Sequence, residues 1–192
     1  MTKKLAKGLR IATIPPVLVT LLLSLLYASG LGIINSLHEL LFGIIFLALI
    51  PASAYPLSSV IPSVRARGRE GQRRLAFVTS ISGYTLGALY AFLAGISDEY
   101  RTLFVTYLVS VVILTFFNKI LKIRASGHAC GTFGPMLPAV YFLGWQWLFP
   151  CAAICAGVIW SSLYLSRHTK SELFFGALCS VSAFVICSII IL

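Results

Sequence analysis

Long apolar segments, separated by short polar breaks, run along this chain from end to end. They cover about 11–33, 37–61, 75–96, 102–121, 127–143, 146–165 and 172–192. A helix needs about 20 apolar residues to cross the hydrocarbon layer of a membrane, and most of these segments approach that length. Because 59% of the 192 residues are hydrophobic and only 10% are charged, an ordinary soluble domain is excluded.

The pattern within the segments indicates which secondary structure they form. Backbone groups find no water in lipid, so spanning segments must be α-helices or strands of a closed barrel. Barrel strands alternate apolar and polar residues, and these segments show no such alternation. The sequence therefore predicts an all-α fold, a polytopic transmembrane helix bundle of six to seven spans, in a single domain over residues 1–192.

Prolines mark two segments in which we expect irregular helices. The segment 127–143 is short and contains Pro135 and Pro138, which predicts a broken or tilted helix. The segment 37–61 contains Pro51 and Pro56 and is followed by Pro62, so we expect a kink near its far end.

Positive charge falls almost entirely on one side of the predicted spans. The lysines and arginines of that side are Lys3, Lys4, Lys7, Arg10, Arg65, Arg67, Arg69, Arg73, Arg74, Lys119, Lys122, Arg124, Arg167 and Lys170. Only Arg101, beside Asp98 and Glu99, lies on the other side. The positive-inside rule predicts that the amino terminus and the basic loops are cytoplasmic, in a protein of the plasma membrane. Seven spans then place the carboxyl terminus outside.

A first group of polar residues precedes the segment 127–143. Ser126, Gly127 and His128 lie where a helix begins, and its free N–H groups and dipole attract an anion. Lys122 and Arg124 add positive charge, and arginine can bind two phosphate oxygens at once. We expect these residues to bind phosphate, with His128 donating a proton to a leaving oxygen.

A second group lies between the last two segments, on the same predicted side. His168 and Glu172 are four residues apart and share a helix face if the last helix begins early enough. A carboxylate bonded to one imidazole nitrogen makes the other nitrogen a better nucleophile. We therefore expect His168 to attack phosphorus, Glu172 to orient it, and the neighbouring Arg167 to bind phosphate.

These residues resemble the motifs of the type 2 phosphatidic acid phosphatase superfamily of membrane lipid phosphatases. Ser126-Gly127-His128 matches its middle motif, and His168-x-x-x-Glu172 matches its last motif with Glu in place of Asp. Lys122 and Arg124 stand where its lysine and arginine motif belongs. The motifs lie from Lys119 onward, in a phosphatase-like core of about 102–192. The resemblance implies a phosphohistidine intermediate, no metal or cofactor, and a lipid or isoprenoid phosphate substrate.

The chain departs from the pattern of that superfamily at two places. No proline follows Arg124, and Ser161-Ser162 stands where the superfamily has Ser-Arg. The arginine of that pair binds phosphate in the superfamily. Arg167, or one of the arginines of 65–74, is the expected replacement.

The sequence thus predicts a metal-independent membrane hydrolase, which cleaves a lipid or polyprenyl phosphate or diphosphate at the cytoplasmic face. We expect membrane lipids and the substrate as partners, and no nucleic acid. A phosphotransferase is a related alternative, since only the acceptor would differ. Two further alternatives are a non-catalytic protein that binds anionic lipid and a small anion transporter.

Overall fold

The computed structural model describes residues 2–192, and every regular element within that range is helical. In chain order the elements are α1 (Thr2–Ala12), α2 (Pro15–Ala28), α3 (Leu37–Ile44), η1 (Ile45–Leu49), α4 (Ile50–Ala52), α5 (Ala54–Val60), α6 (Pro62–Arg65), α7 (Gly68–Leu93), α8 (Asp98–Thr115), η2 (Phe116–Ile120), α9 (Gly127–Leu143), η3 (Trp145–Trp147), α10 (Leu148–Tyr164) and α11 (Lys170–Ile191). The predicted all-α class is therefore confirmed.

Five helical stretches are long and apolar enough to cross a membrane. They are Leu37–Val60, Gly68–Leu93, Asp98–Ile120, Trp145–Tyr164 and Lys170–Ile191. A sixth candidate is the pair α1 and α2, whose axes are bent by 54°. These five or six helices are compatible with an integral membrane protein.

Prolines shape the helices that correspond to the first two predicted segments. The helix α1 begins at Thr2, before the predicted start, and the chain breaks ahead of Pro15. Ile14 is extended there, with ψ of 144°, because a residue before proline is disfavoured in the helical region. In the second segment, a π-helical turn over Ile45–Leu49 and an extended Ile61 give the expected irregularity.

The segment 127–143 forms α9, which is one continuous helix of 17 residues. Of the two forms that we expected, a broken or a tilted helix, the broken form is wrong, because the helix continues through Pro135 and Pro138. Both prolines are buried inside the helix. Proline cannot donate a backbone hydrogen bond, so the turns at these two residues each lack one. Packing against α2, α8, α10 and α11 stabilises these turns.

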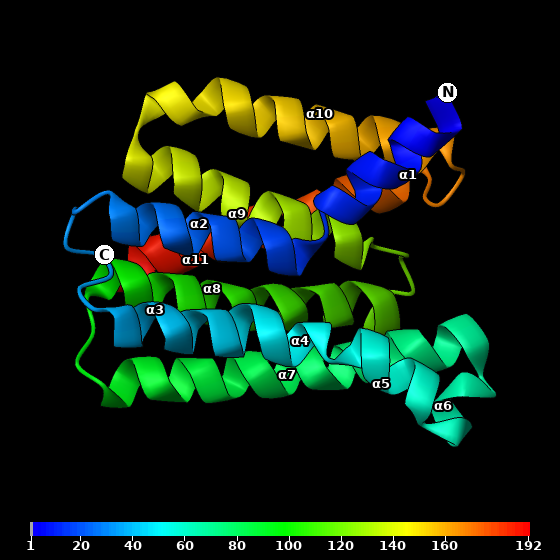
Figure 1. Ribbon diagram of the computed structural model, residues 1–192, viewed down its shortest axis with the longest axis horizontal. Coiled ribbons are helices and arrows are strands. Elements are labelled where there is room, and N and C mark those ends of the chain that lie inside the picture. Colours follow the sequence, from blue (N-terminus) through cyan, green and yellow to red (C-terminus); the bar gives the residue numbers. More distant parts are fainter. Residues whose placement is uncertain (1) are drawn as a thin grey trace.

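The long helices run side by side along one axis of the molecule (Figure 1). One end holds the start of α1, the short helix α6, the link between η2 and α9, and the link between α10 and α11. The links between α2 and α3, α7 and α8, and α9 and α10 lie at the other end, together with the carboxyl terminus. Every predicted basic loop therefore lies at the first end, which we call the basic end.

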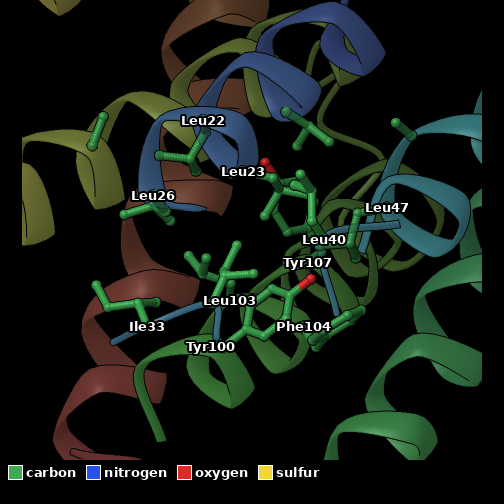
Figure 2. Close-up of a cluster of buried hydrophobic side chains, with 14 of the residues drawn as sticks. Leu22, Leu23, Leu26, Ile33, Leu40, Leu47, Tyr100, Leu103, Phe104 and Tyr107 are labelled. Carbon is green, nitrogen blue, oxygen red and sulfur yellow. The ribbon is translucent and has the colours of Figure 1, made fainter. Parts of the chain in front are cut away.

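A cluster of buried side chains joins α2, α3 and α8 (Figure 2). Its labelled members are Leu22, Leu23, Leu26, Ile33, Leu40, Leu47, Tyr100, Leu103, Phe104 and Tyr107. Tyr100 donates a hydrogen bond of 2.8 Å to the carbonyl of Glu39, so its buried hydroxyl is paired. Large apolar side chains such as Leu93 and Ile189 are exposed on the outside, where a membrane would cover them.

A close contact between α11 and the start of α9 holds the basic end together. The backbone N–H of Ser126 donates a 2.8 Å hydrogen bond to the carbonyl of Glu172. One turn further along α11, a Cβ on Gly176 would lie 2.3 Å from the carbonyl oxygen of Ser126. The two segments can therefore approach this closely only because residue 176 has no side chain.

We predict that Gly176→Ala destabilises the fold, because the added methyl group collides with rigid backbone. Such overpacking typically costs about 1–3 kcal/mol, which lowers the melting temperature by several degrees. The measurement is thermal unfolding of purified protein in detergent. The matched control is Gly134→Ala in α9, where a Cβ has its nearest neighbour at 3.8 Å. Equal melting temperatures for the two variants would contradict the prediction.

Candidate active site

His168 and Glu172 form a hydrogen-bonded pair at the basic end. Thr169 caps α11 by accepting a 3.2 Å hydrogen bond from the N–H of Glu172, so the helix begins at Lys170. This start places the two side chains on one face, and His168 Nδ1 lies 2.9 Å from Glu172 Oε2. Since an ionised carboxylate only accepts hydrogen bonds, Nδ1 carries the proton and Nε2 keeps a free lone pair.

Arg124 contacts the second oxygen of the same carboxylate. Its Nε lies 3.3 Å from Glu172 Oε1, and its side chain is 70% exposed. Glu172 therefore lies between an imidazole and a guanidinium, with its own side chain only 12% exposed. The exposed pair contributes little to stability, but it limits the positions that the carboxylate can take.

Ser126 begins α9 as the sequence predicts. Its hydroxyl accepts a 3.2 Å hydrogen bond from the N–H of Ala129, and the side chain is buried. Asn118 stabilises the link between η2 and α9 through two hydrogen bonds of 3.2 Å. Its Oδ1 accepts from the N–H of Ala125, and its Nδ2 donates to the carbonyl of Ala125. The free N–H groups of the first turn of α9 are thus held in place for an anion.

Two adjoining cavities open around these residues. The basic cavity, of about 790 Å³, is lined by Glu70, Arg73, Arg74, Phe77, Val78, Leu114, Thr115, Asn118, Lys119, Arg124, Ala125, Ser126, Gly127, His168 and Glu172. The core cavity, of about 430 Å³, reaches into the bundle past His128, Tyr84 and Tyr107. Arg73, Gly127 and His168 line both. His168 therefore lies at the junction of the two cavities.

The surroundings of His168 favour its neutral form. Burial is the largest cause that lowers the pKa of its imidazole below the ordinary 6.5, and the charges of Arg10 and Arg73 lower it further. The hydrogen bond and the charge of Glu172 oppose these effects. His168 is therefore unprotonated on Nε2 near neutral pH, as a nucleophile must be.

His128 lines the core cavity beside His168. Its side chain is half-buried, and its Nε2 has no hydrogen-bond partner within residues 2–192. An unpaired buried imidazole nitrogen is costly, and active sites are one place where such groups are kept. The nitrogen is therefore available for a proton transfer to a group in the cavity.

The structure brings most of the predicted site residues together. His168, Glu172, Arg124, Ser126 and Gly127 line the basic cavity, and His128 lines the adjoining core cavity.

Two predicted phosphate ligands lie elsewhere. Lys122 is exposed with a positive φ of 55°, and Arg167 is exposed while its backbone N–H donates to the carbonyl of Ser162. Lys119, Arg73 and Arg74 line the basic cavity in their place.

Sequence reasoning missed one residue of this site, Arg10. Its Nη1 donates a 3.0 Å hydrogen bond to the hydroxyl of Ser162, and Arg10 lines the core cavity with both histidines. The signal available in the sequence was Ser162 itself, which stands where the resembling superfamily has arginine. Nothing in the sequence shows that residue 10 lies beside residue 162.

No group of three or more histidine, cysteine, aspartate or glutamate side chains in residues 2–192 is placed to hold a metal ion. The chain matches no known protein family, no characterised protein and no solved structure.

We predict that the His168 imidazole titrates below pH 6.5, and that charge substitutions move its pKa in opposite directions. Arg73→Gln should raise the pKa, because a nearby positive charge is removed. Glu172→Gln should lower it, because the carboxylate that stabilises the imidazolium is lost. The measurement is an NMR titration of histidine-labelled protein in detergent, assigned with His168→Gln. A pKa above 6.5 in the unsubstituted protein would contradict the described environment.

Proposed function

We propose that this protein is an integral membrane phosphatase, which hydrolyses a lipid or polyprenyl phosphate or diphosphate through a phosphohistidine intermediate. One observation carries the proposal: His168 is oriented by Glu172 at the junction of two adjoining cavities, and cationic side chains line both. The neutral imidazole provides the nucleophile, and the surrounding cations provide the charge that a phosphate needs.

In the first step, Nε2 of His168 attacks phosphorus and forms an N–P bond. The bond between phosphorus and the leaving oxygen breaks, and His128 in its protonated form gives its proton to that oxygen. The negative charge of the bound phosphate favours the protonated form of His128. Glu172 stabilises the positive charge that develops on the His168 ring through the hydrogen bond at Nδ1.

In the second step, water attacks the phosphorus of phosphohistidine. His128, now neutral, accepts a proton from the water as the new P–O bond forms. The N–P bond breaks, the electron pair returns to Nε2 of His168, and inorganic phosphate is released. Neither step changes an oxidation state or requires a metal ion.

The two cavities support a substrate with a charged head and an apolar tail. Arg73, Arg74, Lys119 and Arg124 line the cavity that would hold the phosphate. The core cavity is lined by apolar side chains such as Val19 and Leu47, together with polar ones such as Tyr84 and Arg10. Binding there would shield an acyl or prenyl chain from water.

The proposal predicts metal-independent phosphate release by purified protein in detergent with EDTA. The substrates are phosphatidic acid, phosphatidylglycerol phosphate, and prenyl monophosphates and diphosphates. His168→Ala should reduce release by about 10³-fold or more, because it removes the nucleophile. His128→Ala should reduce it by about 10²–10⁴-fold, because it removes the acid. With a radiolabelled substrate, acid-labile label should accumulate on the protein and be absent from His168→Ala.

The matched control is His38→Ala. This histidine lies at the start of the second predicted span, makes an edge-to-face contact with Phe42 in α3, and lines neither cavity. The variant should keep near wild-type activity. Absence of phosphate release from every substrate by folded protein would overturn the proposal.

The proposal includes an orientation, with the amino terminus and active site cytoplasmic in the plasma membrane. It is supported by the gathering of the basic loops at one end of the bundle (Figure 1). We predict that alkaline phosphatase fused after Leu192 is active in bacterial cells, whereas green fluorescent protein fused there does not fluoresce. Fusions after Lys122 should give the reverse pattern. A fluorescent fusion after Leu192 would contradict this orientation.

A further inference from the structure

The first helix packs against α10 and brings Arg10 to the site. A Cβ on Gly157 would lie 2.9 Å from Leu9 Cδ2, so the small residue in α10 lets α1 approach closely. Thr2 Oγ1 and Tyr164 Oη form a hydrogen bond of 2.9 Å nearer the basic end. The chain then bends between α1 and α2, which leaves Arg10 facing Ser162 at 3.0 Å.

Arg10 is a half-buried cation without a counter-charge. The whole chain has only five acidic residues, and none within the described range forms an ion pair with Arg10. Two acids line the adjoining basic cavity, and both are already paired, Glu172 with His168 and Arg124, and Glu70 with Arg74. Removing a charge from water costs free energy unless an opposite charge pairs with it. An anion from outside the chain would therefore stabilise Arg10 at this position.

The residues around Arg10 indicate where that anion would bind. Arg10 lines the core cavity together with Arg73 and His168, which also line the basic cavity, so the anion would bind where the two cavities join. A guanidinium has five N–H groups, and the bond to Ser162 uses one of them. The remaining N–H groups can form a bidentate contact with two oxygens of a tetrahedral anion.

We propose that Arg10 is a catalytic residue that binds the phosphate oxygens of the substrate during transfer to His168. This inference rests on the proposed function, and it adds a residue from the first helix to the site. Arg10 supplies from α1 the guanidinium that the resembling superfamily carries at the position of Ser162. Charge develops on the phosphate oxygens in the transition state, so the contact accelerates transfer as well as binding.

The geometry suggests a charge-relocation experiment. Phosphate release is measured for Arg10→Ala, for Arg10→Lys, and for the double variant Arg10→Ala with Ser162→Arg. We expect Arg10→Ala to lower kcat/KM by about 10²–10³-fold, with most of the loss in kcat. Arg10→Lys should recover part of the loss, since lysine keeps the charge without the bidentate geometry. The double variant should recover at least about tenfold over Arg10→Ala, because the Oγ of Ser162 lies 3.0 Å from the Nη1 of Arg10 and an arginine there can return a guanidinium to the site.

The matched control is Lys7→Ala. Lys7 is an exposed cation on the same helix, three residues before Arg10, and lines neither cavity. Its removal should leave kcat/KM unchanged. An Arg10→Ala variant as active as Lys7→Ala would overturn the role of Arg10 while leaving the phosphatase function intact.

A second measurement separates the two proposals. Orthovanadate, a tetrahedral phosphate mimic, is added to each protein in detergent, and the shift in melting temperature is recorded. We expect stabilisation of the wild type and of Lys7→Ala, and no stabilisation of Arg10→Ala. If the wild type releases no phosphate but shows this pattern, the phosphatase function fails and the anion site of Arg10 stands. If orthovanadate stabilises no protein, or stabilises Arg10→Ala as well as the wild type, the anion site is overturned.

Discussion

The backbone hydrogen bond from the N–H of Ser126 to the carbonyl of Glu172 is the contact on which the rest of the site depends. It joins the first turn of α11 to the first residue of α9, and Gly176 provides the room for the close approach. Once these helix starts meet, Thr169 sets where α11 begins, and Glu172 is then positioned to hold His168. The positions of His168, of Glu172 and of the free N–H groups of α9 therefore all depend on this one contact. The start of a helix suits such a site because its first backbone N–H groups have no partner within the helix and can bind an anion.

The lysines and arginines at the basic end can each have two roles. Lysines and arginines near the ends of spans favour a cytoplasmic location, and those that line a cavity also favour an anionic ligand. Arg73 and Arg10 are two such residues, and both lower the pKa of His168. The cations that would attract phosphate thus also favour the neutral form of His168, the proposed nucleophile. Glu172 is the one acidic side chain in the described residues that forms an ion pair with His168, and Glu70 is paired with Arg74.

The pattern of residues predicted the helical class and part of the site for a local reason. Apolar runs of about 20 residues leave the backbone few alternatives in lipid, and residues four apart meet on a helix face. His168 and Glu172 therefore pair as expected, and Ser126 caps α9 as expected. The phosphate ligands were less predictable, because they lie in links between helices. Lys122 adopts a positive φ that no pattern of side chains signals, and it is exposed outside both cavities. The break expected at Pro135 failed to appear because neighbouring helices bury that part of α9.

What the sequence determined by itself was the class of fold, the end of the bundle at which the motifs gather, and the pairing of His168 with Glu172. All three follow from hydrophobicity, charge and helical periodicity, which act over a few residues or a single span. Only the tertiary structure decided which cations line the cavities. Arg10 and Ser162 are far apart in the chain. They meet because the chain bends between α1 and α2, and because α1 packs closely on Gly157 of α10. Such a meeting depends on the angle between helices and on the fit of their surfaces, and neither can be read from residue spacing.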